Sequence, residues 1–305
     1  MERSISNKLF ARLAKQRMQG RIIAARHLAD IQEEIEKYHR DGLLDEELYS
    51  EYFRFTFDLP ENAQECRSII VIAAPQPHVR ITFTWNERQV QTVVPPTYLH
   101  YKEVYKEIRD DVAATLSAEG YHVFPSSLPE KTLASHSGLG GYGKNNISYV
   151  PGLGSYHQLV SFYSDLPPEE DGWSEAQMME KCQKCTTCIR SCPTGAIPTD
   201  RFLLRAERCI TFLNERPGDF PEWIDPSWHT CLIGCLECQR VCPLNKEIEP
   251  GTFEIAAFSQ EESELILSGV ALDRLPDEMV RKLKLADMTR YFNVLPRNLG
   301  VLLKQ

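Results

Sequence analysis

The stretch KCQKCTTCIRSCPTGAI, residues 181–197, decides the architecture of this 305-residue chain. Its four cysteines are Cys182, Cys185, Cys188 and Cys192, and Pro193 follows the last of them. In a C-x2-C-x2-C-x3-C-P run, three cysteines hold one [4Fe-4S] cluster and the fourth reaches across to a second cluster. The run therefore predicts that Cys182, Cys185 and Cys188 share one cluster and that Cys192 belongs to another.

A second cysteine group, GCLECQRVCPLN at residues 234–245, supplies the partner that the first group requires. By the same crossing, Cys242 completes the first cluster, while Cys235 and Cys238 join Cys192 in the second. One ligand is still missing. It could be Cys209 in RCITFLNE or Cys231 in HTCLIGC, and spacing alone does not choose between them.

Zinc is the structural alternative for this region, because paired C-x2-C groups also bind Zn²⁺ through four thiolates. Three features favour iron and sulfide instead: the three cysteines in a row, the x3-C-P ending of both groups, and the lack of a four-cysteine set that closes locally. We therefore predict two [4Fe-4S] clusters. Cys66 and Cys231 are then left with structural roles.

Composition limits where such a protein can work. Ten cysteines grouped as C-x2-C pairs, with no apolar signal-peptide core after Met1, indicate metal ligation in a reducing cytoplasm. No apolar stretch is long enough for a membrane helix, so no membrane role is expected. The formal net charge of −9 argues against non-specific binding of nucleic acid. The basic N-terminal segment is predicted to be a surface helix, since Ile5, Leu9 and Leu13 recur every fourth residue.

The part of the chain before the cysteines reads as an α/β domain. SIIVIAA at residues 68–74 suits a buried strand, and ITFTWNERQVQTVV at residues 81–94 predicts a hairpin that turns at Asn86 and Glu87. A helix should follow, with one face made of Tyr98, Tyr101, Tyr105, Ile108, Val112 and Leu116. Two more strands are expected around residues 147–150 and 158–163.

The composition changes at LPPEEDGWSE, residues 166–175, which is polar and rich in turn residues. We therefore predict an N-terminal domain at 1–167, a double-cluster domain at 168–250, and a segment of short helices at 251–305. The predicted class is α+β. WIDPSWHT, residues 223–230, is expected to shield a cluster from water, and His157 and His229 are expected to be hydrogen-bonded structural residues.

The cysteine region resembles epoxyqueuosine reductase, including the isolated cysteine that opens CITFL. The likeness continues upstream in LPEKTLASHSGLGGYGKNN, residues 128–146, and LGSYHQLVSFYSDLP, residues 153–167. It implies a ferredoxin-like double-cluster domain, an N-terminal domain of cobalamin-binding type, and electron delivery from the clusters to cobalt. Reductive dehalogenases are similar in this combination. The resemblance also favours Cys209 over Cys231 as the eighth ligand.

Upstream of the cysteines, the resemblance implies a set of corrinoid contacts. Four glycines within seven residues allow a backbone to approach a large group closely, and a lysine followed by two asparagines offers donors to its polar tail. No D-x-H-x-x-G motif is present, so no lower axial histidine of that kind is expected. The candidate contacts are Tyr98, Ser137, Gly138, Leu139, Tyr142, Gly143, Lys144, Asn145, Asn146 and Ser155.

One departure from the family concerns the proton donor. Epoxyqueuosine reductases carry an aspartate before the glycine segment, whereas VFPSSLPEK, residues 123–131, has no carboxylate until Glu130. Glu130, Tyr98 or His100 could supply the proton, or the substrate differs, so the catalytic residue stays open. The leading hypothesis is a cobalamin-dependent reductase of a small molecule or modified nucleoside, fed by an external low-potential electron donor. The alternatives are a ferredoxin-like protein that reduces a corrinoid partner, and a tRNA epoxyqueuosine reductase with an altered acid.

Overall fold

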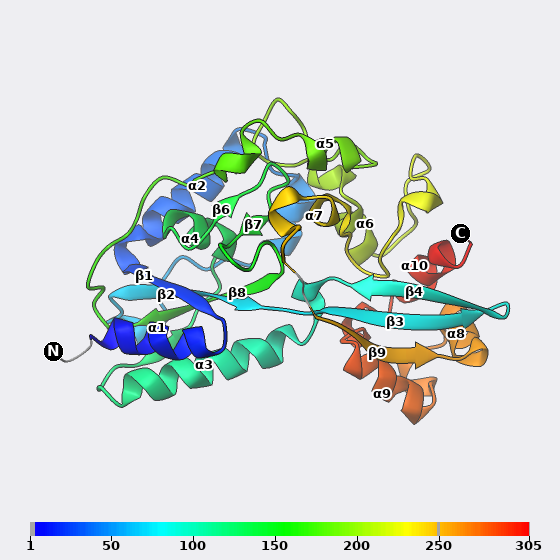
Figure 1. Ribbon diagram of the computed structural model, residues 1–305, viewed down its shortest axis with the longest axis horizontal. Helices are drawn as coiled ribbons and strands as arrows, with labels where there is room; N and C mark the ends of the chain where they lie inside the picture. The colour runs from blue at the N-terminus through cyan, green and yellow to red at the C-terminus, as the bar shows by residue number, and fades with distance from the viewer. Residues whose placement is uncertain (1–3, 249–250, 305) are drawn as a thin grey trace. The chain divides into compact units, whose positions relative to one another are not determined.

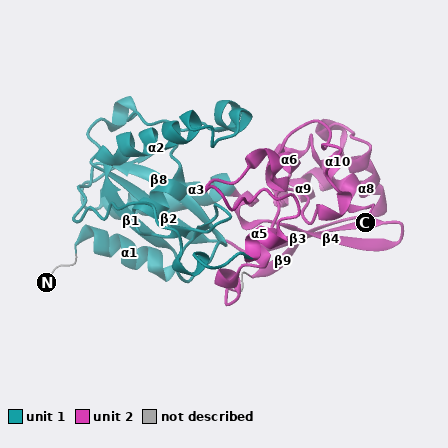
Figure 2. Ribbon diagram, turned by 90° about the horizontal axis from the view of Figure 1, so that it is seen from above, with its two compact units in different colours: residues 1–75, 101–186 teal, residues 76–100, 187–305 magenta. Residues whose placement is uncertain are grey.

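The computed structural model describes residues 4–248 and 251–304. Two compact units make up the chain: unit 1 comprises residues 1–75 and 101–186, and unit 2 comprises residues 76–100 and 187–305 (Figure 2). Each unit combines helices with β-sheet, so the predicted α+β class is confirmed. The two units divide the chain differently from the predicted domains at 1–167, 168–250 and 251–305.

Unit 1 is built on a four-stranded antiparallel sheet in the order β1-β2-β8-β5 (Figure 1). The expected buried strand is β2, and it lies in the middle of this sheet. Its helices and strands are α1 (Ile5–Lys15), β1 (Gln19–Ala24), α2 (Leu28–Arg40), β2 (Ser68–Pro75), α3 (Tyr101–Ser117), β5 (Val123–Pro125), α4 (Glu130–His136), β6 (Gly141–Tyr142), β7 (Ser148–Tyr149) and β8 (His157–Ser164).

Both faces of this sheet are covered, which explains why β2 is apolar throughout. Ile70 and Ile72 of β2 pack into a core with α1 and α3, and Ile69 and Val71 pack into a second core with α2 and α4. Successive strand side chains point to opposite faces, so a strand that is buried on both sides needs a continuous apolar run. Figure 1 shows α1 and α3 together on one side of the sheet.

Unit 2 contains the predicted hairpin, β3 (His78–Trp85) and β4 (Arg88–Val94). Asn86 and Glu87 both have positive φ, as a two-residue hairpin turn requires. The third strand of this sheet, β9, runs parallel to β3. The other elements are α5 (Thr187–Ser191), α6 (Ile210–Glu215), α7 (Glu237–Arg240), β9 (Thr252–Phe258), α8 (Gln260–Leu267), α9 (Asp277–Leu285) and α10 (Leu295–Leu302).

Three expectations from the sequence were wrong in detail. The chain forms strand β1 between α1 and α2, although the basic N-terminal segment was expected to be one surface helix. Phe253 lies in β9 and not in a helical segment, because β9 pairs with β3 far back in the sequence. Tyr98 ends a short 3₁₀ turn before α3, so it does not share a helical face with Tyr101 and Tyr105. No described helix is long and apolar enough to cross a membrane.

The pairing of β9 with the hairpin predicts a specific pattern of stability. Phe258 is 2% exposed and stacks on Phe83 with ring centroids 5.0 Å apart, whereas Phe253 on the same strand is 61% exposed. Phe258→Ala should lower the free energy of unfolding by about 3–5 kcal/mol, because it removes a buried ring and leaves a cavity.

The matched variant Phe253→Ala should change that free energy by less than about 0.5 kcal/mol. Urea denaturation of the two variants measures the difference. Equal effects would show that β9 does not pack on the hairpin as described.

Candidate functional site

The first cysteine run begins in unit 1 and ends in unit 2. Cys182 and Cys185 lie in unit 1, where the Cys185 N–H donates to the Cys182 carbonyl over 3.2 Å. In unit 2, the Cys192 N–H donates to the Cys188 carbonyl over 3.1 Å, at the end of α5. The predicted second ligand set lies wholly in unit 2, so its members can be placed relative to one another.

The second set is linked by mutual electrostatic interactions. Burial raises the pKa of the Cys209 thiol, and the neighbouring Cys192 raises it further. Burial likewise raises the pKa of Cys235, with added contributions from Cys231, Cys209 and Cys238. Thiols that raise one another's pKa lie close enough for their charges to interact. The four predicted ligands therefore gather in one region of unit 2.

Backbone N–H groups face these sulfurs. Cys209 precedes α6, and its sulfur accepts hydrogen bonds from the backbone of Thr211 and Phe212. The sulfur of Cys235 accepts one from the backbone of Glu237, the first residue of α7. Such donors stabilise a thiolate, which is the form that binds iron, and they tune the potential of a bound cluster. These residues therefore fit a [4Fe-4S] cluster.

Cys231 and Cys209 differ in their neighbours. Cys231 is 2% exposed, and burial raises its pKa to about 11. It interacts with Cys235, whereas Cys209 interacts with both Cys235 and Cys192. Both cysteines therefore interact with Cys235, and the assignment of Cys209 as the eighth ligand stays a prediction.

A buried amide holds the ligand-bearing segments of unit 2 together. Asn214, near the end of α6, donates through Nδ2 to the carbonyl oxygens of Gly234, over 2.9 Å, and Cys231, over 3.4 Å. Its Oδ1 lies 3.1 Å from Nδ1 of His229, which is thus the hydrogen-bonded residue that was predicted. Asn298 of α10 donates to the carbonyl oxygens of both Asn214 and Leu232 over 2.9 Å. The helix after Cys209 and the loop before Cys235 are thereby fixed to one another.

Tyr98, a candidate corrinoid contact, lies in unit 2 beside this loop. Its hydroxyl donates to Oε1 of Glu215, and burial raises the pKa of that carboxyl. Gly234 has φ of +72°, and a Cβ there would come within 2.9 Å of the Tyr98 ring. Glycine is therefore required next to Cys235, so that the tyrosine can pack against the backbone. The His100 N–H donates to Asp287 over 3.1 Å.

The glycine segment of unit 1 is folded closely on itself. A Cβ on Gly140 would lie 2.6 Å from the Tyr149 carbonyl oxygen, and one on Gly143 would lie 2.5 Å from Oδ1 of Asn145. Gly138 has φ of +67°. These glycines are explained by turns and by close approach within the chain itself.

The polar candidates of this segment also have partners within unit 1. Ser137 donates to the Ala134 carbonyl, Asn145 donates to the Tyr149 hydroxyl, and the Tyr142 hydroxyl lies 3.2 Å from Thr132. Leu139 packs in the core with α2 and α4. Asn146 is buried with φ of +55°, and Ser155 is also buried.

Lys144 connects the glycine segment to the first cysteine run. Its ammonium donates to the carbonyl oxygens of Gln183 and Cys185, each over 3.0 Å. The sequence predicted this lysine as a corrinoid contact, and no motif indicated its role in shaping the loop that carries Cys182 and Cys185. The contact places one positive charge beside thiols that must lose protons to bind iron.

Two polar atoms at the start of β8 have no partner among the described residues: Nδ1 of His157 and Oε1 of Gln158. Burial lowers the pKa of His157 to about 4, so the ring is neutral near pH 7. Buried polar atoms are normally hydrogen-bonded, and an exception calls for a ligand or an ordered water. These atoms lie two and three residues after Ser155, and the sequence had indicated only a structural histidine there.

Glu130, one of the three candidate proton donors, is the first residue of α4. Burial raises its pKa to about 7, while a hydrogen bond with Ser161 opposes that rise. Ser161 in turn lies 2.8 Å from the Ser126 hydroxyl, next to β5. Phe124 of β5 belongs to the stretch that has no carboxylate before Glu130. It packs against the core with α2 and α4.

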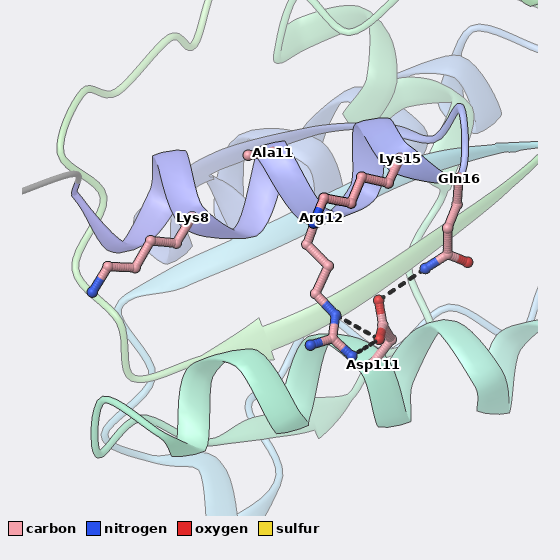
Figure 3. Close-up of a pocket in the computed structure, with 6 residues that line it drawn as sticks. All are labelled: Lys8, Ala11, Arg12, Lys15, Gln16 and Asp111. Carbon is pink, nitrogen blue, oxygen red and sulfur yellow. Dashed lines mark hydrogen bonds and ion pairs between the residues drawn. The ribbon is translucent and has the colours of Figure 1, made fainter.

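A surface hollow of about 570 Å³ lies between α1 and α3 (Figure 3). Figure 3 shows Arg12 and Gln16 turned toward Asp111, with Gln16 Nε2 3.1 Å from its carboxylate. Lys8, Ala11 and Lys15 complete the lining. The residues that line the hollow include no cysteine and neither of the unpartnered atoms of His157 and Gln158. Arg12 is already paired with Asp111. The hollow is therefore a solvated ion-pair surface.

Replacement of the buried amide should destabilise unit 2. Asn214→Asp keeps the shape of the side chain but loses both donors and places a carboxylate against carbonyl oxygens. We expect the free energy of unfolding to fall by about 2–4 kcal/mol. Asn293→Asp, the same change at an exposed position, should shift it by less than about 0.5 kcal/mol. Similar denaturation midpoints for the two variants would contradict the role given to Asn214.

The eighth ligand can be identified by counting iron. After anaerobic reconstitution, Cys209→Ser should bind about four iron atoms per chain where the parent protein binds about eight, because one cluster loses a ligand. Cys231→Ser is the matched control and should retain about eight. The reverse result would assign the ligand to Cys231.

Comparison with known proteins agrees with this geometry. Residues 181–245 match a family model described as a 4Fe-4S double cluster binding domain. An epoxyqueuosine reductase of Burkholderia pseudomallei is 31% identical over 183 residues, which cover 53% of this chain and 44% of the relative. The epoxyqueuosine reductase of Bacillus subtilis is 36% identical over 119 residues, which cover 39% of this chain and 30% of the relative. Each match thus covers less than half of the relative's length.

Solved structures show a similar fold. Epoxyqueuosine reductase from Streptococcus thermophilus superposes with a TM-score of 0.70 at 19% identity, covering 98% of this chain and 80% of that one. An epoxyqueuosine reductase bound to an epoxyqueuosine-modified tRNA-Tyr stem loop also gives a TM-score of 0.70, at 22% identity, with the same coverage. Taken with the sequence matches, these findings show a chain that is similar in fold to epoxyqueuosine reductases and that contains a match to a double [4Fe-4S] cluster binding domain at residues 181–245.

Proposed function

We propose that this chain is an iron-sulfur reductase that receives single electrons from an external low-potential donor and uses a bound cobalamin to reduce an organic substrate. The observation that carries the proposal is the gathering of Cys192, Cys209, Cys235 and Cys238 in unit 2, with backbone N–H groups facing two of the sulfurs. Cobalamin, when bound, would supply a low-valent metal centre able to deliver electrons to carbon.

Comparison with known proteins supports two parts of this proposal, and residues of unit 1 support the binding of a corrinoid. The double-cluster match gives the electron-transfer part, and the relatives named epoxyqueuosine reductase give the enzymatic part. In unit 1, the orphaned atoms of His157 and Gln158 lie two and three residues after Ser155. They suit the amide groups at the edge of a corrinoid, because one can donate or accept and the other accepts.

For the substrate, we propose an organic molecule other than epoxyqueuosine in tRNA. One related structure from Bacillus subtilis is described as having a catalytic loop, bearing an aspartate, swung out of the active site. In this chain, Phe124 takes part in the core and the following residues are Pro125 and Ser126. An aromatic ring or a hydroxyl cannot replace a carboxylic acid as a proton donor near neutral pH.

The charge distribution also fits a substrate smaller than tRNA. The net charge is −9, and three of the basic residues near the C-terminus form ion pairs within unit 2. Lys282 pairs with Glu262, Arg281 pairs with Glu278, and Arg290 pairs with Asp287. Cations paired in this way contribute less to phosphate binding than unpaired ones.

A second candidate function is electron transfer to a corrinoid held by another protein. The hydrogen bonds that Ser137, Lys144 and Asn145 make within unit 1 favour it, because those donors are already used. In that case the chain binds no corrinoid tightly and needs no proton donor.

Corrinoid retention separates the two functions. The protein is purified anaerobically, incubated with cobalamin and passed through a desalting column, and its absorption spectrum is recorded. The reductase predicts about one corrinoid per chain, and His157→Ala should reduce that content. Loss of all corrinoid on the column would overturn the reductase and leave the electron-transfer protein.

Glu130 is the proton donor that we propose within this reductase, and its titration can be tested without substrate. Its folded-state pKa of about 7 lies above the ordinary value of 4.5, so the folded state holds the proton more tightly than the unfolded state. Stability is therefore lost as pH rises between these two values, and the loss persists above pH 7.

Glu130→Gln cannot ionise, so it should be more stable than the parent at pH 8, by about 1–3 kcal/mol, and similar to it at pH 4. Glu103→Gln on the exposed face of α3 is the control and should show no such trend. Thermal denaturation across this pH range provides the measurement. An unchanged pH profile in Glu130→Gln would remove Glu130 as the buried acid.

A further inference from the structure

Trp173 lies between two histidine rings in unit 1. The ring of His27 stacks on it with centroids 4.2 Å apart and planes 6° from parallel. The ring of His136, from α4, stacks on it with centroids 4.3 Å apart and planes 9° from parallel. Trp173 belongs to the polar segment that joins β8 to the first cysteine run, and we call residues 167–178 the strap.

His27 has a carboxylate on each ring nitrogen. Its Nδ1 lies 2.7 Å from Asp30 of α2, and its Nε2 lies 3.0 Å from Asp171 of the strap. An ionised carboxylate can only accept hydrogen bonds, so both nitrogens must carry protons for both contacts to form. Asp171 also accepts from the Ala24 N–H and pairs with Arg26.

His136 is held in the same way. Its Nδ1 lies 2.5 Å from the Ser174 carbonyl oxygen of the strap, and its Nε2 lies 2.6 Å from Oε2 of Glu34 on α2. Both partners are acceptors, so this ring too needs two protons. Tyr38 donates to the other oxygen of Glu34 over 2.9 Å. A cationic His136 ring makes a favourable cation–π contact with the Trp173 indole, and the His27 ring also stacks on this indole.

The strap is otherwise held by a few backbone contacts. Ser174 N–H donates to the His136 carbonyl, and the strap's last residues join β6, where Tyr142 N–H donates to the Gln177 carbonyl over 2.8 Å. Cys182 follows four residues after the strap ends. Trp173 also packs against the core formed with α2 and α4, so this packing and the polar contacts together give the strap its local stability.

We propose that Trp173, clasped between His27 and His136, is a pH-sensitive latch that holds the strap, and with it the approach to the first cluster run, against α2 and α4. This inference goes beyond the proposed function and does not depend on it. The groups that face the latch are Asp30, Glu34 and Tyr38 of α2, Arg26 before α2, Asp171 of the strap, and Tyr142 of β6.

The sign of the pH dependence follows from the charges. Burial lowers the pKa of His136, but hydrogen bonds to Glu34 and the Ser174 carbonyl outweigh it, so the net pKa is raised. The latch is therefore complete below the ordinary imidazole pKa and is lost as pH rises through the raised value. Burial raises the pKa of Glu34 and of Asp171, yet the histidine contacts leave both lowered, so the latch persists into moderately acidic solution.

Hydrogen–deuterium exchange of the full chain, resolved on strap peptides, tests the latch. After correction for the intrinsic effect of pH on exchange, strap amides should exchange about tenfold faster at pH 9 than at pH 6.5. His136→Gln should give fast exchange at both pH values. His122→Gln, which removes an exposed histidine paired with Asp165 and not stacked on tryptophan, should behave like the parent.

A second variant guards against misfolding of the first. Glu34→Gln keeps an acceptor for His136 but removes the charge that stabilises the imidazolium, so the midpoint of strap release should move to lower pH. Corrected exchange that is equal at both pH values in the parent protein would overturn the latch. So would an unchanged pH dependence in His136→Gln together with an unmoved midpoint in Glu34→Gln.

Discussion

The ligand region of unit 2 depends on one buried amide, Asn214. A side-chain amide without solvent must satisfy its donors and its acceptor inside the protein, and this one does so with three residues of one loop, His229, Cys231 and Gly234. It fixes the helix that follows Cys209 to the loop that leads to Cys235. Since thiolates bind a cubane cluster only when all of them are correctly placed, a polar contact remote from the sulfurs governs the site.

Electrostatic interactions also influence whether the thiols of the ligand region can bind iron. Burial raises the pKa of the grouped thiols, which opposes loss of their protons, while the N–H groups at the starts of α6 and α7 favour the thiolates. In unit 1, Lys144 adds a cation beside the Cys182 to Cys185 turn. Metal binding must displace the thiol protons, so these donors and this charge lower the free energy of the loaded state.

The sequence predicted the cluster-binding cysteines better than it predicted which strands pair with one another. Cysteine spacing is set by the geometry of a cluster, so the two groups could be found and divided between two clusters. The hairpin around Asn86 was also foreseeable from local alternation and turn residues. Its partner β9 was not, because pairing between residues about 175 positions apart leaves no local signal. Strand β1 was hidden for the same reason.

For the candidate cofactor-binding residues, the sequence pattern indicated suitable residue types but did not predict which atoms they contact. The glycines of residues 138–143 suggested a cradle for a large group, while the structure shows them enabling turns and close packing against Tyr149. Tyr98 followed a helical spacing but lies in a 3₁₀ turn beside the ligand loop. The orphaned atoms of His157 and Gln158 could not be inferred, because an unmet hydrogen bond depends on neighbours that only the fold brings together.

The central claim is that the two cysteine groups together hold two cubane clusters. Iron and acid-labile sulfide, measured per chain in anaerobically reconstituted protein along with the electron paramagnetic resonance spectrum after reduction, test it directly. The account predicts about eight irons and about eight sulfides per chain, with a signal broadened by two interacting reduced clusters. Zinc bound in place of iron, or about four irons with the signal of one isolated cluster, would contradict it.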